Sequence, residues 1–204
     1  MAITNGYATL AEAKYYMTSR GLTMSVDTNE DTVIEDLIEA ASRYIDKATG
    51  RKFWVDTNDT TRYYTTDDPE VVFIDDYSSI TSVTIDYAED RTYSVILAAT
   101  DWDAHPFNAT TDGVPITWLK ITPNAAYSFT TVDRGVKIIG KTGWAAVPDA
   151  IKTACLGIVQ NAYSDRSGQA SAGNVTVTSA GVVIRPQDVP AFAAEIIKSF
   201  RRMV

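Results

Sequence analysis

The most specific chemical pattern in this sequence matches the phosphate-binding loop of nucleotide-binding proteins. Residues 135–142 read G-V-K-I-I-G-K-T and fit the pattern G-x-x-x-x-G-K-[ST] at every position. A phosphate-binding loop directs its backbone N–H groups at the phosphates, and a helix begins at its lysine. Here the middle residues V-K-I-I are typical of a β-strand, and Gly143, Trp144 and Pro148 delay the next helix. We therefore predict a strand followed by a turn, and no nucleotide site.

A second candidate is a site for a hard cation around the only histidine of the chain. Asp101, Asp103 and His105 alternate along residues 101–105, so an extended segment would place their side chains on one side. Carboxylate oxygens suit such cations, but a metal site needs more converging ligands and a second shell of hydrogen bonds, and neither is visible in the sequence. We interpret the segment as a solvated acidic loop before Pro106 and predict no metal.

Two aspartate pairs and one cysteine complete the candidates for acid–base or nucleophilic chemistry. The pairs at residues 67–68 and 75–76 border predicted turns, where solvated carboxylates are common. Cys155, the only cysteine, can form no internal disulfide and has no marked partner base, so we interpret it as a small buried apolar residue. Any Ser/His/Asp mechanism would have to depend on His105 alone. The sequence therefore predicts no catalytic residues and no cofactor, and we do not expect an enzyme.

The charge balance limits the kinds of partner. The 204 residues carry a formal net charge of -8, and 45% of them are hydrophobic, as in ordinary soluble globular proteins. Gripping DNA phosphates needs clustered Lys and Arg, so the acidic balance argues against it, whereas an acidic wall that DNA does not stick to is compatible. No run approaches the ~20 apolar residues of a membrane span, and residues 1–7 do not resemble a signal peptide. We expect synthesis in the cytoplasm and no membrane partner.

The clearest predicted element is a long helix over residues 29–50. It begins with a good N-cap, Asn29, and its apolar residues recur at three- and four-residue steps along one stripe. Other helices must cover this stripe. The predicted core of the resulting bundle is Ile34, Leu37, Ile38, Ala41 and Ile45. A shorter helix over residues 10–20, which begins with a Thr9–Glu12 capping box, is expected to pack on the long one.

The middle of the chain is rich in β-branched and aromatic residues broken by turn clusters, which predicts an antiparallel sheet, sandwich or small barrel. The expected strands are 62–66, 71–74, 82–87, 93–97, 116–121, 126–131 and 136–139. The aromatic residues of this region could form a core or subunit contacts, or they could line a groove for a glycan; we favour the first. They are Trp54, Tyr63, Tyr64, Phe73, Tyr77, Tyr87, Tyr93, Trp102, Trp118, Tyr127, Phe129 and Trp144.

Helical patterning returns near Pro148, which is well placed at the start of a helix. The apolar stripe of this helix comprises Ile151, Ala154, Cys155, Ile158, Val159 and Ala162. Residues 164–187 are predicted to form a flexible loop or hairpin, and Pro190 opens a last helix that runs to residue 204.

We expect the last helix to be a docking element for a partner, with an apolar face and a basic end, and not a permanent core helix. Its candidate docking residues are Phe192, Ile196, Lys198, Phe200, Arg201 and Arg202. The alternative is that the helix packs back on the bundle and that its basic residues only complement the helix dipole.

These elements predict an α+β fold. Residues 1–53 and 147–204 supply the helices of one bundle, and residues 54–146 form a large antiparallel β insertion between them. The bundle must therefore be assembled from both ends of the chain.

Three phrases stand in a definite order along these segments. The first is Y-A-T-L-A-E-A-K at residues 7–14 with Tyr16, and the second is L-I-E-A-A-S-R-Y-I-D at residues 37–46, which runs on to T-G-R-K-F at residues 49–53. The third is G-K-T-G-W followed by V-P-D-A-I-K, within residues 140–152. Together they resemble the head-to-tail connector proteins of tailed bacteriophages, also called adaptor or head completion proteins.

The resemblance implies a structural protein of the virion neck that assembles as a ring, commonly a dodecamer. Such a ring lies between the portal protein and the tail or stopper protein, and DNA passes through its lumen without specific binding. The β insertion is longer than in compact members of the family, which leaves its own partner open. The alternative function is a β-rich binding module of a phage capsid or tail accessory protein that recognises a glycan or receptor, and a hydrolase comes third.

Overall fold

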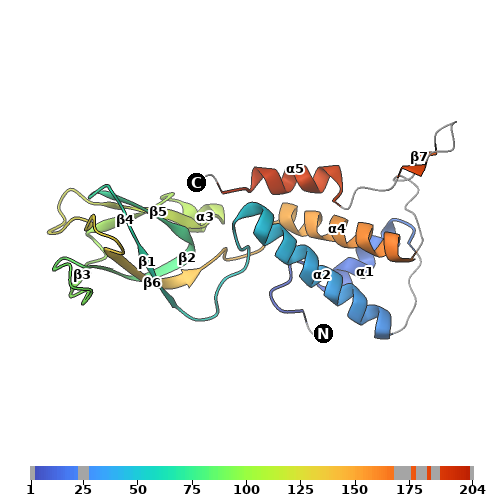
Figure 1. The fold of residues 1–204 in the computed structure, drawn as a ribbon, viewed down its shortest axis with the longest axis horizontal. Helices are drawn as coiled ribbons and strands as arrows, with labels where there is room; N and C mark the ends of the chain where they lie inside the picture. Colours follow the sequence, from blue (N-terminus) through green and yellow to red (C-terminus); the bar gives the residue numbers. More distant parts are fainter. Residues whose placement is uncertain (1–2, 23–27, 168–175, 178–182, 185–188, 203–204) are drawn as a thin grey trace. The chain divides into compact units, whose positions relative to one another are not determined.

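The computed structural model describes residues 3–22, 28–167, 176–177, 183–184 and 189–202, and its α+β architecture confirms the predicted fold class (Figure 1). The chain forms two compact units that alternate along the sequence. Met1–Arg51 and Val147–Val204 form a helical unit, and Lys52–Ala146 form a β unit. Among the residues described, no helix is long and apolar enough to cross a membrane.

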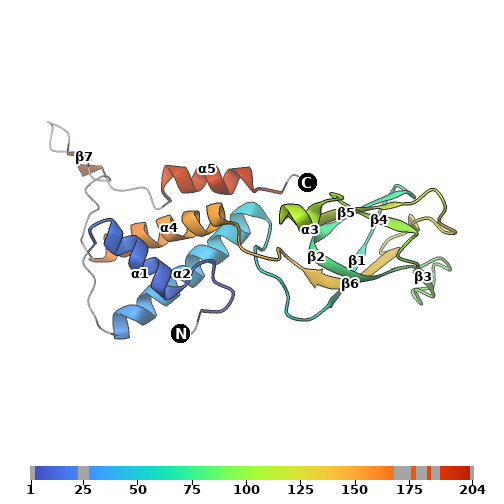
Figure 2. The ribbon, with the colours of Figure 1, turned by 180° about the vertical axis from the view of Figure 1, so that it is seen from behind.

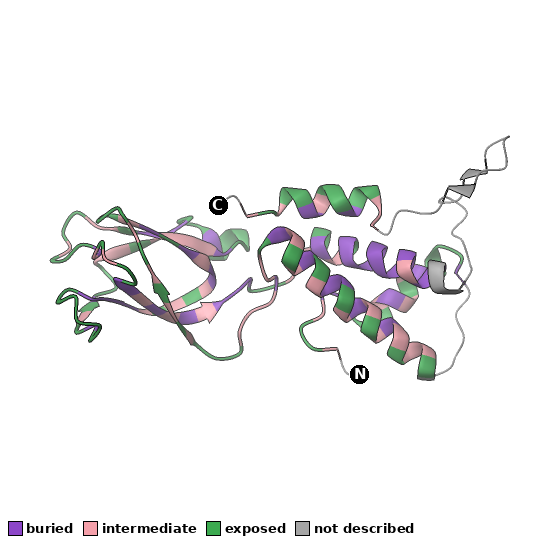
Figure 3. Ribbon diagram, viewed as in Figure 1, coloured by how far each residue is buried: buried purple, intermediate pink, exposed green. Residues whose placement is uncertain are grey.

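A central helix organises the helical unit. α4 (Asp149–Ser167) packs against α1 (Leu10–Ser19), α2 (Thr28–Thr49) and α5 (Ala191–Ser199), and it lies between these neighbours in both ribbon views (Figure 1, Figure 2). Every residue from 154 to 161 is buried, so α4 is covered all round and not along one stripe (Figure 3). The central position of α4 is hard to predict from the sequence, because small residues such as Ala154 and Gly157 contribute little to an apolar pattern. The same small residues allow neighbouring helices to approach closely.

α2 presents the predicted apolar stripe with one exception. Ile34, Ile38 and Ile45 are fully buried and Ala41 nearly so, whereas Leu37 is only partly buried. At ~100° per residue, Leu37 lies about 70° from the centre of the stripe and therefore at its edge. The expectation that Leu37 is buried in the bundle core is therefore wrong.

Polar contacts tie the start of the chain to α2 and α4. Thr9 Oγ1 accepts a hydrogen bond from the Glu12 N–H at 3.2 Å, and the Glu12 carboxylate accepts one from the Thr9 N–H at 2.8 Å, which confirms the predicted capping box. Glu12 also accepts a hydrogen bond from Lys152 of α4 at 2.8 Å. Just before α1, the buried Tyr7 donates its N–H to Ser42 Oγ of α2 at 3.0 Å. These contacts fix α1 against both longer helices.

The β unit is built on one six-stranded antiparallel sheet with the order β1-β6-β2-β5-β4, in which β3 pairs with β2. The strands are β1 (Thr60–Tyr64), β2 (Val71–Ile85), β3 (Val95–Leu97), β4 (Trp102–His105), β5 (Ile116–Ile121) and β6 (Val136–Thr142), with a one-turn helix α3 (Ala109–Asp112) before β5. One face of the sheet carries the core of Val72, Ile74, Tyr77, Val83, Ile85, Leu97, Leu119, Phe129, Val136 and Ile138.

β2 is a single strand of 15 residues, where the sequence predicted two strands separated by a turn. Its pairing register shifts between Phe73 and Tyr77 and twice more before Ser82. Such bulges bend a strand, and they allow the first half of β2 to pair with β5 and the second half with β6. The polar residues that suggested a turn, including the 75–76 aspartate pair, therefore lie inside the strand.

Two more expectations for the β unit are wrong. Residues 126–131 form no strand; Phe129 instead donates its N–H to the carbonyl oxygen of Pro69 at 2.9 Å and buries its ring in the core. Conversely, the predicted acidic loop at Trp102–His105 is β4, at one edge of the sheet. Both differences arise from pairing with residues distant in the chain.

The predicted loop or hairpin at residues 164–187 begins later than expected, because α4 continues to Ser167. Within it, β7 (Thr176–Val177) pairs with β8 (Val183–Ile184). The rest of this segment lies outside the described residues.

Candidate assembly surfaces

The residues that match a phosphate-binding loop form β6 and its preceding turn, which confirms the predicted strand. β6 pairs with β1 and with β2 along its length, so its backbone N–H and C=O groups form the hydrogen bonds of the sheet. Gly140 is required by this packing, because an added Cβ would lie 2.3 Å from the carbonyl oxygen of Ser79. Thr142 donates its hydroxyl to Asp56, and the next helix begins only at Asp149. The helix N-terminus that a phosphate loop needs is not next to the lysine.

The carboxylates of Asp75 and Asp76 have separate structural roles. Asp75 accepts hydrogen bonds from the Arg62 guanidinium at 2.8 Å and from the Tyr64 hydroxyl at 3.1 Å. Burial raises the pKa of Tyr64, which keeps its hydroxyl protonated as a donor. Asp76 accepts a hydrogen bond from the indole N–H of Trp144 at 2.9 Å. Neighbouring side chains of a strand point to opposite faces, so this pair is not arranged as a general acid and base.

The only histidine and the only cysteine are both buried. His105 stacks on Trp118 with ring centroids 3.7 Å apart and an interplanar angle of 9°. Cys155 lies with its sulfur 3.7 Å from Ser42 Oγ, and burial raises the pKa of its thiol to about 11, which confirms its interpretation as a small buried residue. Within the described ranges, no group of three or more His, Cys, Asp or Glu side chains could hold a metal ion.

α5, the predicted docking helix, packs on α4. Its buried residues are Ala193 and Ile197, which are 0% and 6% exposed, and the sequence prediction did not include them. The ring of Phe192 covers Gly157 of α4, where an added Cβ would lie 2.3 Å from the ring atom Cζ. The expectation that this helix is not a permanent core helix is therefore wrong, and the alternative, that it packs back on the bundle, holds. The four-residue spacing of Ala193 and Ile197 was the signal for this packing.

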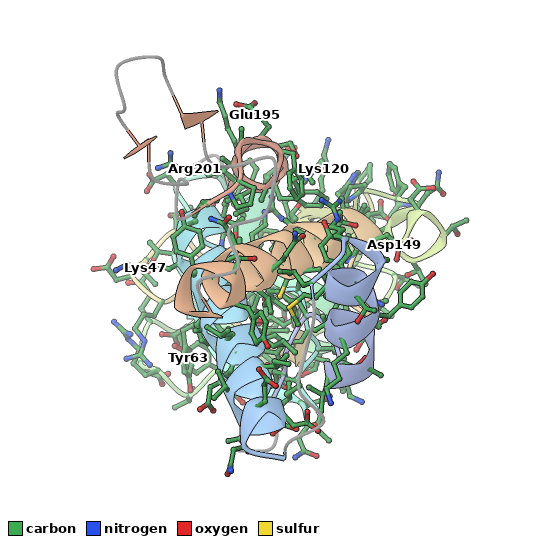
Figure 4. The ribbon with its side chains drawn as sticks, turned by 90° about the vertical axis from the view of Figure 1, so that its right-hand side faces the viewer. Lys47, Tyr63, Lys120, Asp149, Glu195 and Arg201 are labelled. Carbon is green, nitrogen blue, oxygen red and sulfur yellow. The ribbon has the colours of Figure 1, made fainter. Side chains whose placement is uncertain are left out.

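The outer side of α5 remains available to a partner. Of the six predicted docking residues, Lys198 and Arg201 are exposed, Phe192 is 40% exposed, and Ile196, Phe200 and Arg202 are partly buried. Glu195 points away from the bundle on the same helix (Figure 4). Arg202 also donates its backbone N–H to Thr49 at the end of α2, at 2.8 Å. The basic end of the helix is thus held in a fixed place at the surface.

A row of four aromatic side chains begins on the face of the β sheet opposite the core and ends at Phe107, in the turn after β4. Phe73 of β2 lies across from Trp118 of β5, which lies across from His105 of β4. The ring centroids are 6.4 Å apart for Phe73 and Trp118, 3.7 Å for Trp118 and His105, and 4.0 Å for His105 and Phe107. Phe73 and Phe107 are each 72% exposed. We call Phe73, Trp118, His105 and Phe107 the aromatic row.

Sequence reasoning found only half of the aromatic row. Phe73 and Trp118 were among the aromatic residues assigned to a core or an interface, but the alignment of His105 and Phe107 with them requires the register of β4 and β5. A usable signal was the run V-V-F-I at residues 71–74, because four consecutive apolar residues in a strand make both of its faces apolar.

A second aromatic cluster in the β unit is covered by cations of the same chain. Tyr63 and Tyr93 lie with ring centroids 5.3 Å apart. The guanidinium of Arg134 is 4.3 Å from the centroid of Tyr63, and the ammonium of Lys137 is 4.9 Å from that of Tyr93. Cation–π contacts of this kind satisfy the ring faces within the chain, so this cluster is not an open apolar surface.

This α+β chain exposes aromatic side chains on both units, which is typical of proteins that assemble with partners. The family model described as "Head completion protein" (HCP) matches residues 9–203. The chain therefore belongs to the head completion protein family.

Two solved structures share the fold of the whole chain. One is described as the neck of an empty gene transfer agent (GTA) particle computed with C6 symmetry; the TM-score is 0.55 at 14% identity, over 100% of this chain and 94% of that chain. The other is described as the virion of a native GTA particle, with a TM-score of 0.54 at 12% identity and the same coverage of 100% and 94%. No curated protein matches the sequence.

Proposed function

We propose that this protein is a head-to-tail connector of a phage-like particle, made in the host cytoplasm and built into the virion neck. Copies of it form a ring between the portal protein and the tail or stopper protein. The observation that carries the proposal is the match of residues 9–203 to the head completion family. The shared fold with a chain of a GTA neck supports it, because that similarity extends over both units.

The ring surrounds the path of the DNA in this proposal. The net charge of -8 suits that position, because a channel wall that repels phosphates allows DNA to pass without specific binding. We propose a dodecamer, since twelve copies are compatible with the six-fold symmetry used for the similar neck.

The outer side of α5 is the portal contact in this proposal. Lys198 and Arg201 are exposed there and oppose the acidic balance of the chain, so they suit an acidic partner surface. Because α5 is also part of the bundle, the test should change only surface charges. Lys198→Glu combined with Arg201→Glu should weaken portal binding about tenfold or more at low salt with an unchanged melting temperature, whereas Lys47→Glu, an exposed change in α2, should not. Equal portal affinity of the double variant and the wild type would exclude this contact.

Mass photometry of the purified chain, alone and mixed with portal protein, tests the ring. The proposal expects a multi-copy species that binds portal. A chain that stays a single copy under both conditions and binds a glycan would favour the β-rich recognition module instead.

A further inference from the structure

The aromatic row presents two largely exposed aromatic rings, those of Phe73 and Phe107, on the β unit. The opposite face of the same strands already carries the core residues Val72, Ile74 and Leu119, which are 0% to 1% exposed. Phe73 and Phe107, at 72% exposed, add nothing to that core. Large contiguous apolar groups on a surface mark an interaction site, and aromatic residues are enriched where protein subunits meet.

The aromatic row is also rigid. Phe73, Trp118 and His105 lie on three neighbouring strands, and cross-strand pairing holds their spacing. His105 is 8% exposed between Trp118 and Phe107, and its Nε2 atom has no hydrogen-bond partner within the described part of the chain. The rings of Trp118 and Phe107 contact this ring. A partner that covers the row meets a preorganised surface and loses little side-chain entropy on binding.

The charges beside the row indicate what kind of partner fits. The next cross-strand position on the same face pairs Asp103 of β4 with Lys120 of β5, so this pair adds no net charge beside the row although the whole chain carries -8. Two copies of an acidic protein repel one another wherever acidic surfaces meet. Their contact is favoured at a surface that is apolar and locally neutral, which is what the row and its Asp103–Lys120 neighbours provide.

We propose that the aromatic row is part of the contact between neighbouring copies of this chain in the ring, an inference that depends on the proposed function. A ring of identical chains with rotational symmetry is held by heterologous contacts, so the row of one copy packs against a different surface of the next. The basic end of α5 suits an acidic partner, while the neutral row suits another copy of this acidic chain. In this proposal the outer side of α5 contacts the portal protein, and the aromatic row contacts the next copy of the chain.

The test removes the exposed rings without disturbing the core. The variant Phe73→Gln with Phe107→Gln changes two side chains that are each 72% exposed, and Tyr87→Gln, at 64% exposed, is the matched control in the same unit. Mass photometry of each protein, with and without portal, should show a self-association constant weakened about tenfold or more in the double variant and unchanged in the control. Single copies of the double variant should still bind portal.

Other results overturn the inference in distinguishable ways. A double variant that forms rings like the wild type would exclude the row as the contact and leave the ring proposal intact. Rings that persist without binding portal would assign the row to the portal instead. A wild type that remains a single copy in every mixture would overturn both proposals.

A thiol at the row gives a second measurement, which reports directly whether the row is covered in the assembled ring. The natural Cys155 is buried, so a maleimide should label mainly the new thiol of Phe107→Cys. Labelling should be fast in the free chain and at least tenfold slower in the assembled ring, whereas Tyr87→Cys should label at the same rate in both. Equal labelling of Phe107→Cys before and after assembly would overturn the inference.

Discussion

Truncation of Ile38 to alanine should strongly destabilise the helical unit, whereas the same truncation of Leu37 should have little effect. Ile38 is fully buried, its carbonyl oxygen lies 4.0 Å from the sulfur of Cys155 on α4, and its Cγ2 lies 3.1 Å from where a Cβ on Gly6 would stand. The change removes three carbon groups, worth about 2.4 kcal/mol at ~0.8 kcal/mol each, and the cavity adds to this loss. We expect about 2–5 kcal/mol in total.

Leu37 loses the same number of carbon atoms, but it is only partly buried at the edge of the stripe, so we expect roughly 1 kcal/mol or less. Urea denaturation followed by far-UV circular dichroism measures the free energy of unfolding for both variants. Tryptophan fluorescence provides an internal control, because Trp54, Trp102, Trp118 and Trp144 all lie in the β unit. Equal losses for Ile38→Ala and Leu37→Ala would refute the placement of the α2 stripe.

The remaining predictions concern the N-cap of α1, the carboxylate of Glu12 and the strand at residues 135–142. Thr9→Ala removes the N-cap of α1 and should lower the free energy of unfolding by about 1 kcal/mol in urea denaturation, while Thr9→Ser should retain most of it. The hydrogen bonds from Lys152 and from the Thr9 N–H lower the pKa of Glu12 below its ordinary value of 4.5. The ionised Glu12 therefore stabilises the folded chain above pH 4.5, and this contribution is lost as the pH falls through the lowered pKa. Lys152→Met should make the free energy of unfolding depend less on pH in this range. Isothermal titration with ATP and magnesium should give no saturable signal, and a signal that disappears in Lys141→Ala would contradict the assignment of residues 135–142 to a strand.

The features that the sequence predicted correctly depend on residues close together in the chain. The Thr9–Glu12 capping box, the α2 stripe through Ile34, Ile38 and Ile45, and the strand nature of β6 each follow from local spacing and residue type. Residues 135–142 show that a motif match alone does not predict a site. Their glycines and lysine match a phosphate-binding loop, but no helix begins at the lysine, where such a loop requires one.

The features that the sequence did not predict depend on pairing between distant residues. The two halves of β2 merge into one strand only because β5 and β6 pair with it in turn. The middle of α4 is buried on all sides because three helices from both ends of the chain cover it. α5 joins them through the ring of Phe192, which covers Gly157, and through the fully buried Ala193. The aromatic row likewise requires the strand register. Candidate surfaces are therefore harder to predict than elements, since they combine residues that only the tertiary fold brings together.

Electron cryomicroscopy of particles assembled with a tagged copy of the chain shows most directly whether this protein is a ring component of the neck. We expect density for both the helical and the β unit, repeated around the DNA passage next to the portal, with the aromatic row buried between neighbouring copies. Particles in which the tagged chain lies anywhere other than between portal and tail, or in which it is not arranged as a ring, would contradict this expectation.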